Sequence, residues 1–381
     1  MDFELTQSQK DIQMAAREFA RGEFDKELAL DLDQQNKFPE EIWKKAAELG
    51  FTSMLIPEEY SGQELGMIEN TLVVEEFCRA DSTIGSALAL SSFGSQCLVR
   101  FGSDELRQKF LPRVAQGNMV AGWAFRESSH TLNIREVSTT ALKDGNEWQI
   151  NGMKTFVVSA GIAGFYSVLC KTDTEISAGE SSTAIILVEA DREGVSIRNM
   201  GKKLGTRTVP TAEIVFENVR VPFLNLIGQE HKGLSHALDS FTESRILVGS
   251  QALGIAQGAF DRALAYAKQR EQFGKKLVEF QITRHKLAEM ATKIELARLI
   301  TYKAAWAYDQ GRMDSELTSM AKMYAAQTAV EVADESIQLF GGYGYILDYE
   351  VERFYRDAKV TELYEGSKEV QKDIIAGDLI G

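Results

Sequence analysis

The segment Tyr364-Glu365-Gly366-Ser367 near the C-terminus combines an aromatic ring, a carboxylate and a flexible backbone step. A carboxylate here could act as a general base if burial raises its pKa and so its basicity. The competing interpretation is an exposed acid at a helix start, where the helix dipole favours negative charge. For an isolated Glu-Gly-Ser step the second interpretation is better, so the choice depends on the rest of the chain.

Two further segments are notable for an arginine and for adjacent glycines. Arg270-Glu271-Gln272-Phe273-Gly274 contains a guanidinium, which can make charge-assisted hydrogen bonds. Gln338-Leu339-Phe340-Gly341-Gly342-Tyr343-Gly344-Tyr345 contains adjacent glycines, where the backbone can be approached closely. Both have plain alternatives, because a Gly-Gly pair after a long helix is commonly a C-cap and a lone arginine is commonly solvated or ion-paired.

Composition bounds the class of protein. The chain has 381 residues, 44% of them hydrophobic, which is enough for two or three domains with sizeable cores. Its formal net charge of -14 argues against a nucleic-acid partner, because a phosphate backbone would be repelled. We find no apolar run near the roughly 20 residues that span a bilayer and no targeting segment before the first helical pattern. We therefore expect a cytoplasmic protein.

The cysteines and histidines indicate no metal chemistry. The three cysteines are too few and too widely spaced for a disulfide framework or a metal cluster, and they fit small core positions in a reducing cytosol: Cys78, Cys97 and Cys170. The four histidines have no metal-binding spacing: His130, His231, His236 and His285. We expect no metal site and no catalytic histidine.

The candidate residues must be positioned by three kinds of structure along the chain. Residues 1–118 show helical spacing and predict an N-terminal helical domain. Thr6-Gln7-Ser8-Gln9 can form a capping box, and a second helix is expected from Pro39 to its stop at Gly50. Further helical patterns cover Asn70 to Arg79 and Asp104 to Gln116.

Residues 119–227 predict a middle β domain, a small antiparallel barrel or sandwich rather than a parallel sheet. Turn sequences such as Asp144-Gly145-Asn146 and Asn151-Gly152 separate its short β-rich runs. These runs are Val120 to Phe125, Glu147 to Ile150, Thr155 to Val158, Phe165 to Leu169, Thr183 to Val188, Gly194 to Ile197 and Glu213 to Phe216.

Residues 228–381 predict a C-terminal helical bundle. Long helical patterns cover Ser235 to Gln269, Gln281 to Asp309 and Glu316 to Phe340, and small residues in the first of them would allow close backbone packing. A four-helix bundle is the expected result. The fold class predicted for the whole chain is therefore α+β, with a β domain between two helical domains.

This order of domains and the motifs together resemble the acyl-CoA dehydrogenase family. The resemblance rests on four segments in the right order over some 380 residues: the Arg270 and Gln338 segments already described, Arg353-Phe354-Tyr355-Arg356-Asp357-Ala358, and the tail around Glu365. It implies FAD-dependent α,β-dehydrogenation of an acyl-CoA thioester, with Glu365 removing the α-proton and a hydride passing to flavin N5. It also implies a homotetramer and electron-transferring flavoprotein, or another acceptor, as the oxidant.

The resemblance also assigns binding residues. It implies two groups of FAD contacts. The first group comes from the same subunit as the cofactor: Phe125, Arg126, Phe156, Val158 and Ser367. The second group reaches the cofactor of a neighbouring subunit: Arg270, Phe273, Gln281, Gln338 and Gly342. The substrate contacts that we expect are Phe241, Arg245 and Tyr364.

Two flavin motifs depart from the family pattern. Where most members read Thr-Glu-Pro-x-x-Gly-Ser-Asp, this chain reads Arg126-Glu127-Ser128-Ser129-His130-Thr131-Leu132-Asn133. Where they read Trp-Ile-Thr-Asn, it reads Phe156-Val157-Val158-Ser159. A threonine expected at the flavin ring has thus become Arg126, and a hydroxyl expected near N5 has become a methyl of Val158. Either backbone groups and Arg126 compensate, or flavin binds differently.

Some branches of the family carry the base just before an arginine in the first long C-terminal helix. Here the arginine corresponds to Arg245 and the preceding residue is Ser244, which cannot serve unaided. Glu243 lies one position away and would point about 100° aside on a helix. Glu365 therefore remains the expected base.

Substrate identity stays open at this stage. Gly85 stands where members that use glutaryl-CoA place an arginine for the distal carboxylate, so a dicarboxylic substrate held that way is not expected. Coenzyme A and a carrier-protein phosphopantetheine present the same arm and thioester, and the altered segment after Glu127 keeps a carrier-bound substrate as an alternative. A third alternative is a subunit that has lost or altered its flavin and acts through assembly.

Overall fold

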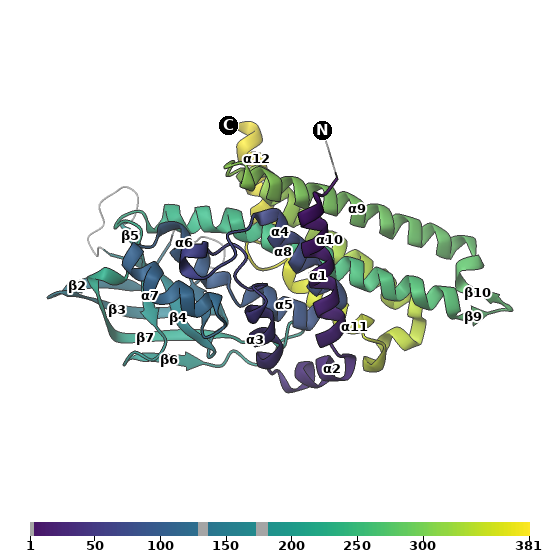
Figure 1. The fold of residues 1–381 in the computed structure, drawn as a ribbon, viewed down its shortest axis with the longest axis horizontal. Helices are drawn as coiled ribbons and strands as arrows, with labels where there is room; N and C mark the ends of the chain where they lie inside the picture. Colours follow the sequence, from purple (N-terminus) through teal and green to yellow (C-terminus); the bar gives the residue numbers. More distant parts are fainter. Residues whose placement is uncertain (1–3, 129–135, 173–181) are drawn as a thin grey trace.

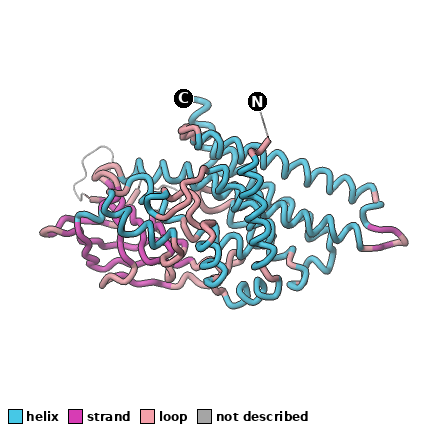
Figure 2. The backbone as a smooth tube through the Cα atoms, viewed as in Figure 1, coloured by secondary structure: helices cyan, strands magenta, loops and turns pink. Residues whose placement is uncertain are grey.

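The computed structural model describes residues 4–128, 136–172 and 182–381. Figure 1 shows strands gathered at one end of the molecule and long helices extending toward the other, and Figure 2 shows the same division by colour. The helix, β, helix order confirms the predicted α+β fold class. Within the described residues, no helix is both long and apolar enough to cross a membrane.

Seven α-helices and two 3₁₀ turns are described before the first strand. They are α1 (Gln7–Glu23), α2 (Lys26–Gln35), α3 (Glu40–Glu48), η1 (Glu58–Tyr60), α4 (Met67–Ala80), α5 (Ser82–Leu90), η2 (Phe93–Ser95), α6 (Gln96–Phe101) and α7 (Asp104–Ala115). The predicted capping box is present, since the Thr6 side chain accepts from the Gln9 amide and the Gln9 side chain accepts from the Thr6 amide. Pro39 is the residue before α3 and not its first helical residue.

The middle of the chain forms one eight-stranded sheet. Its strands are β1 (Val120–Ala124), β2 (Thr140–Asp144), β3 (Glu147–Val158), β4 (Ala163–Lys171), β5 (Thr183–Glu189), β6 (Val195–Arg198), β7 (Thr211–Pro222) and β8 (Leu226–Ile227), with η3 (Phe223–Asn225) before the last. The order is β6-β7-β3-β2-β4-β5-β8, with β1 beside β4. Most pairs are antiparallel, as predicted, but β1 and β2 both run parallel to β4.

The predicted turn at Asn151-Gly152 is wrong, because residues 147–158 form one continuous strand, β3. Its pairing with β7 shifts between Ile150 and Gly152, which is a β-bulge. The Asn151 side chain accepts a hydrogen bond from the Asn218 amide at 2.8 Å, and a Cβ on Gly152 would lie 2.6 Å from Thr139 Oγ1. Gly152 therefore allows β3 to lie closer to Thr139 than a residue with a side chain would.

The C-terminal part is helical, and its three long helices match their predicted limits closely. It comprises α8 (Gly233–Gln269), the hairpin β9 (Glu271–Gln272) and β10 (Lys275–Lys276), η4 (Leu277–Glu279), α9 (Gln281–Asp309), α10 (Ser315–Phe340), η5 (Gly341–Tyr345), η6 (Leu347–Tyr349), α11 (Val351–Thr361) and α12 (Lys368–Ile380). α8 packs against α9, α10 and α11 and also against α4 of the N-terminal part. The bundle is therefore shared between the two helical regions.

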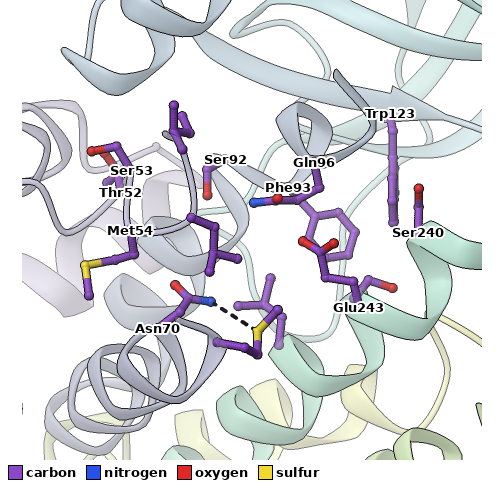
Figure 3. A pocket seen from close by; sticks show the side chains of 15 residues that line it. Thr52, Ser53, Met54, Asn70, Ser92, Phe93, Gln96, Trp123, Ser240 and Glu243 are labelled. Carbon is purple, nitrogen blue, oxygen red and sulfur yellow. Dashed lines mark hydrogen bonds between the residues drawn. The ribbon is translucent and has the colours of Figure 1, made fainter. Parts of the chain in front are cut away.

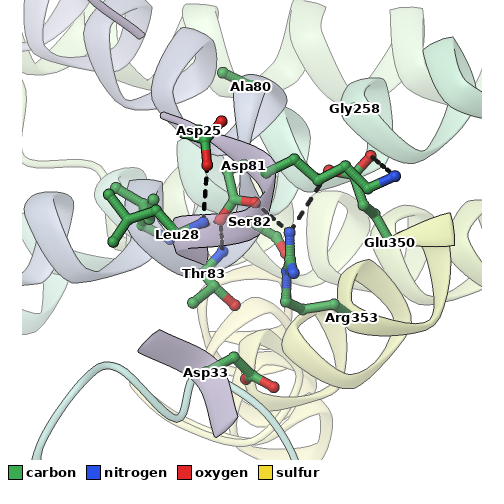
Figure 4. A network of polar contacts seen from close by, with 12 residues as sticks. Asp25, Leu28, Asp33, Ala80, Asp81, Ser82, Thr83, Gly258, Glu350 and Arg353 are labelled. Carbon is green, nitrogen blue, oxygen red and sulfur yellow. Dashed lines mark hydrogen bonds and ion pairs between the residues drawn. The ribbon is translucent and has the colours of Figure 1, made fainter. Parts of the chain in front are cut away.

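A buried ion pair ties the start of α5 to α11 (Figure 4). Arg353 Nη2 lies 2.5 Å from Asp81 Oδ2, and both side chains are almost fully buried. The other oxygen of Asp81 caps α5, because it accepts from the amides of Thr83 at 3.0 Å and Ile84 at 2.9 Å. Glu350 Oε1, 3.6 Å from the same guanidinium nitrogen, adds a second negative charge.

A second buried carboxylate joins all three parts of the chain. Asp357 on α11 accepts hydrogen bonds from the hydroxyls of Ser82 and Thr83 on α5, at 2.7 and 2.5 Å. Its other oxygen accepts from the backbone amide of Thr206, which precedes β7, at 2.5 Å. These bonds fix α11, and therefore the loop that follows it, relative to the sheet.

We predict that Asp81→Asn destabilises the protein by about 3 kcal/mol, because it keeps the helix cap but leaves Arg353 buried without its main counter-ion. Urea unfolding followed by circular dichroism measures the change. The control is Lys44→Met, which removes an exposed ion pair with Glu40 and should hardly move the midpoint. Equal midpoints for the two variants would show that the buried pair does not stabilise the fold.

Candidate functional site

A cavity of about 330 Å³ lies where the sheet meets α8 and the loop between α11 and α12. The sheet and the segment after β1 contribute one wall, α8 contributes the second, and the C-terminal loop with α12 contributes the third. Most lining side chains are aromatic or aliphatic, and the lining includes Trp123, Phe125, Phe156, Val158, Leu238, Phe241, Leu363, Tyr364, Val370 and Ile374. Such a lining suits a flat apolar ligand with a few polar anchors.

Glu365 lines this cavity and is held in an unusual backbone conformation. Its φ of 54° and the φ of 94° at Gly366 put two successive residues in the left-handed region, which is rare for a residue with a side chain. Lys322 Nζ donates to the Gly366 carbonyl at 2.6 Å, and Gln371 Nε2 donates to the carbonyls of Glu365 and Gly366 at 2.9 and 3.0 Å. These bonds hold the loop in this shape.

The carboxylate of Glu365 accepts a hydrogen bond from Ser244 Oγ at 2.6 Å. Burial raises the pKa of Glu365 to about 7, while Ser244, Lys322 and Arg245 oppose the rise. A pKa near 7 gives a carboxylate that is both available and basic at neutral pH. The interpretation of Glu365 as an exposed helix-start acid is therefore wrong, since it is partly buried and faces a cavity.

Two buried cations lie near this carboxylate. Burial lowers the pKa of Arg245, a cavity residue next to Ser244 on α8, and its Nε is buried without a partner among the described residues. Burial also lowers the pKa of Lys322, to about 8. A positive field therefore surrounds Glu365 and favours its ionised form.

The structure separates the expected cofactor residues into two groups. The first group lines the cavity with Glu365 and consists of Phe125, Arg126, Phe156, Val158 and Ser367. The expected substrate residues Phe241, Arg245 and Tyr364 line the same cavity. The hydroxyl of Tyr364 points away from it, because it donates to Gln251 Oε1 on α8.

The second group lies around a separate hollow of about 550 Å³ beside the C-terminal end of α8 and the η5 turn. Arg270, Gln338 and Gly342 line it, and the Arg270 guanidinium carbon lies 5.5 Å from the centre of the Tyr343 ring. Gly341 has a φ of 62° and ends α10, so the C-cap interpretation holds for the first glycine of the pair. A Cβ on Gly341 or Gly342 would meet nothing within 4 Å, so the backbone there is open to a ligand.

Two expected cofactor residues lie outside both linings. Phe273 is at the tip of the β9-β10 hairpin with 93% of its surface exposed, and Gln281 is the exposed first residue of α9. The β9-β10 hairpin lies at the end of the molecule opposite the sheet (Figure 1), and the hollow is lined by Arg270 and Gln272 at the start of that hairpin. If both groups serve one cofactor, a second copy of the chain must supply the second group.

The segment after β1 is fixed by a buried ion pair. Glu127 Oε1 lies 2.7 Å from Lys154 Nζ and also accepts from the Thr139 amide at 2.9 Å. Although burial opposes its charge, Lys154 and these hydrogen bonds hold the pKa of Glu127 at about 2. The neighbouring Arg126 is exposed, with its guanidinium carbon 5.0 Å from the centre of the Phe156 ring. Ser129 to Asn133, including His130, lie outside the described residues.

These residues fit FAD, which is implied by the resemblance. The apolar cavity suits a flavin ring, with the exposed Arg126 at its edge. The open glycines beside Arg270 suit a phosphate-containing portion. Arg126 and Val158 both line this cavity, so these two changes of residue type fall at its wall.

Three residues of the site could not be found from motifs. In the sequence Ser244 stands only where some family members carry the base, and its role as a hydrogen-bond donor to Glu365 depends on folding. Lys322 and Gln371 come from α10 and α12. The sequence signal for Lys322 was weak, since it consists of a lysine within a helix of mostly small residues, 315–340. In the structure this lysine is 1% exposed.

Family sequence models match almost the whole chain. The acyl-CoA dehydrogenase N-terminal domain matches residues 6–118, the middle domain matches residues 122–219 and the C-terminal domain matches residues 231–380.

Individual proteins agree with these matches. The short-chain specific acyl-CoA dehydrogenase of Clostridium acetobutylicum is 37% identical over 380 residues, covering 100% of both chains. The butyryl-CoA dehydrogenase structure from Megasphaera elsdenii has a TM-score of 0.95 at 33% identity and full coverage of both chains. The prolyl acyl carrier protein oxidase AnaB has a TM-score of 0.93 at 28% identity, covering 99% of this chain and 100% of that one. A similar structure, PigA, is an FAD complex, with a TM-score of 0.93 at 28% identity, covering 100% of this chain and 99% of that one.

We predict that Ser244→Ala raises the pKa of Glu365, because it removes a hydrogen bond to the ionised form. The midpoint of the carboxyl titration should move from about 7 upward by about one pH unit or more. Infrared difference spectroscopy of the carboxyl band measures it. Ser250→Ala is the matched control, because Ser250 is a buried serine of α8 that bonds Thr71 and the Ile246 carbonyl instead. A midpoint unchanged in Ser244→Ala would remove the proposed contact.

Proposed function

The chain belongs to the acyl-CoA dehydrogenase family of FAD-dependent oxidoreductases, and from this premise we propose that it dehydrogenates an acyl-CoA thioester with Glu365 as the α-proton base. The observation that carries the proposal is the cavity in which Glu365, its Ser244 donor and the first group of cofactor residues meet. The reaction converts a saturated Cα–Cβ bond into a double bond.

Glu365 is suited to remove the α-proton. With a pKa of about 7, it is ionised in a large fraction of molecules at neutral pH, and its basicity is much greater than that of an exposed carboxylate. Ser244 orients the carboxylate, and the clamped loop limits its movement. FAD, when bound, supplies the acceptor for the hydride that leaves the β-carbon.

The substrate contacts follow from the same cavity. Phe241 and the Tyr364 ring are apolar parts of the lining to which Glu365 also belongs, and they would hold the acyl group and exclude water from the carboxylate. Arg245 has an unpartnered buried Nε and lies beside these residues, so it is suited to a polar atom of the thioester or to charge near Glu365.

Assembly into a homotetramer is part of the proposal. The hollow around Arg270 is far from the chain's own cavity, and Ile346 in its lining is 45% exposed. The adjoining hairpin and η5 turn carry further exposed apolar side chains, Phe273 at 93% and Tyr345 at 87% exposure. Such a surface suits contact with another copy, which would bring the second group to that copy's FAD. Electron-transferring flavoprotein is the proposed acceptor.

A substrate bound to a carrier protein remains the second candidate. The similarity to a prolyl acyl carrier protein oxidase supports it, while the higher identity to an acyl-CoA dehydrogenase supports the CoA thioester. The Glu365–Ser244 pair argues against a non-catalytic subunit, because a subunit without chemistry has no need of a clamped, basic carboxylate.

We predict that Glu365→Gln lowers the rate of flavin reduction by acyl-CoA at least ~10²-fold, since it removes the general base, while flavin content stays unchanged. Anaerobic stopped-flow absorbance measures the rate. The matched control is Glu362→Gln, because Glu362 is a buried carboxylate of the same loop that pairs with Lys359 and Lys368. An active Glu365→Gln variant would exclude the assignment.

The pH dependence follows from the ionised base. Because burial raises the pKa of Glu365 to about 7 and the carboxylate is the active form, flavin reduction should increase as pH rises through about 7 and then level off. A rate independent of pH between 5.5 and 8.5, in a series run at saturating thioester, would contradict this role.

We predict that Arg270→Ala lowers FAD retention on gel filtration by tenfold or more in affinity, through loss of a charge-assisted contact to the pyrophosphate. Lys275→Ala is the control, because Lys275 is an exposed cation of the same hairpin outside the hollow. Equal flavin content in both variants would remove Arg270 from the cofactor site.

A further inference from the structure

A second, much smaller cavity is lined in part by Ser244, the hydrogen-bond donor to Glu365, and Figure 3 shows the side chains around it. It has a volume of about 20 Å³ and is enclosed by the segment 52–56, α4, the η2 turn, β1 and α8. Trp123 lines both cavities. Ser244 lines the small cavity, while its hydroxyl donates to Glu365, which lines the large one. The small cavity therefore adjoins the large one on the far side of Trp123 and Ser244.

The small cavity contains a buried carboxyl group with a free oxygen. Glu243 is 2% exposed, and its Oε2 accepts a hydrogen bond from Tyr308 at 2.8 Å. Its Oε1 has no partner among the described residues, and Figure 3 shows the carboxyl pointing from α8 into the cavity. Thr52 Oγ1, in a side chain 7% exposed, is also unpartnered among the described residues. Unpaired buried oxygens are unfavourable and indicate a polar ligand.

The position of Glu243 follows from helix geometry. It precedes Ser244 on α8, so the two side chains point about 100° apart. Ser244 therefore reaches the base, while Glu243 reaches the cavity behind it. The other polar lining includes Asn70, whose amide makes only a weak 4.0 Å contact with Met67 Sδ, and Gln96 and Ser240.

Charge and volume limit the ligand. No lysine or arginine is among the residues that line this cavity. Arg100, whose charge acts on Glu243 and opposes the rise of its pKa, lies outside the lining, so a second carboxylate in the cavity would have no cation among the lining residues to contact. A side chain at Gly85 would lie 2.5 Å from the backbone of α4, so that position could not hold an arginine either. A volume of about 20 Å³ accepts a group of about the size of one water molecule.

We propose that this cavity receives the far end of the acyl group and that Glu243 selects thioesters whose short acyl chain ends in a hydroxyl. The inference rests on the proposed function, since the thioester must lie beside Glu365. A hydroxyl would satisfy Glu243 Oε1, whereas a methyl would leave it unpaired. Burial raises the pKa of Glu243, which suits a neutral partner better than an ammonium group.

The test compares isosteric ligands in the Glu365→Gln holoenzyme, which binds without turnover. Calorimetry measures the affinity of pantetheine thioesters in matched pairs, 4-hydroxybutanoyl against pentanoyl and 5-hydroxypentanoyl against hexanoyl. The expected result is tenfold or tighter binding of one hydroxyl ligand over its methyl isostere. Adding Glu243→Leu should abolish that preference, and Glu243→Gln, which keeps a hydrogen-bonding group, should largely retain it.

Glu75→Gln is the matched control. Glu75 is also a buried glutamate that accepts from a tyrosine, Tyr302, but both of its oxygens are bonded, the second by Arg298, and it does not line the cavity. It should leave the preference unchanged.

Equal affinity for the two thioesters of every pair in the Glu365→Gln holoenzyme overturns the inference and assigns the cavity to a buried water molecule. This outcome does not depend on whether the protein with the added Glu243→Leu change folds. Tighter binding of the matching ω-amino ligand than of the hydroxyl ligand also overturns it. A hydroxyl preference that disappears in Glu243→Leu supports it. Flavin reduction in the native enzyme is measured separately, so its failure would count against the dehydrogenase function and not against the preference.

Discussion

The close packing of α8 against α4 is the constraint on which the site depends. A Cβ on Gly254 would lie 2.5 Å from the Glu75 carbonyl oxygen, and one on Gly258 would lie 2.4 Å from the Arg79 carbonyl oxygen. The two backbones therefore touch, and α8 can neither rotate nor move outward without losing this contact. Because its rotation is fixed, neighbouring residues near its start face different surroundings, and one helix supplies a wall to two adjoining cavities.

The same helix creates two carboxyl environments of different chemistry. Glu365 receives a hydroxyl from α8 and lies near two cations, so its pKa rises only to about 7 despite burial. Glu243, one helical step from that hydroxyl, has burial as the largest influence on its pKa. Environment, not residue type, thus separates a group that can exchange a proton from one suited to a neutral hydrogen bond.

The sequence predicted what local patterns encode. Helix 281–309 was predicted to the residue, because apolar positions at helical spacing define it. Helix α5 was missed, because it is buried on every side and has no polar face to reveal its period. The Asn151-Gly152 step has turn chemistry, yet pairing with β7 extends the strand through it. The candidate base came from its motif, but its donor and clamps come from three other helices and are set only by tertiary packing.

The altered flavin motifs can be understood from what surrounds them. The buried Glu127–Lys154 pair fixes the backbone that carries Arg126, and Thr155 donates its amide to the Arg126 carbonyl at 2.9 Å. The path of the chain along this cavity wall is thus held by groups independent of the side chains at positions 126 and 158. A guanidinium in place of a hydroxyl at position 126 therefore changes the charge of the wall without changing the backbone that carries it. If the flavin ring occupies this cavity, as proposed, a cation at its edge favours the form of the ring that carries more negative charge, and therefore favours electron acceptance.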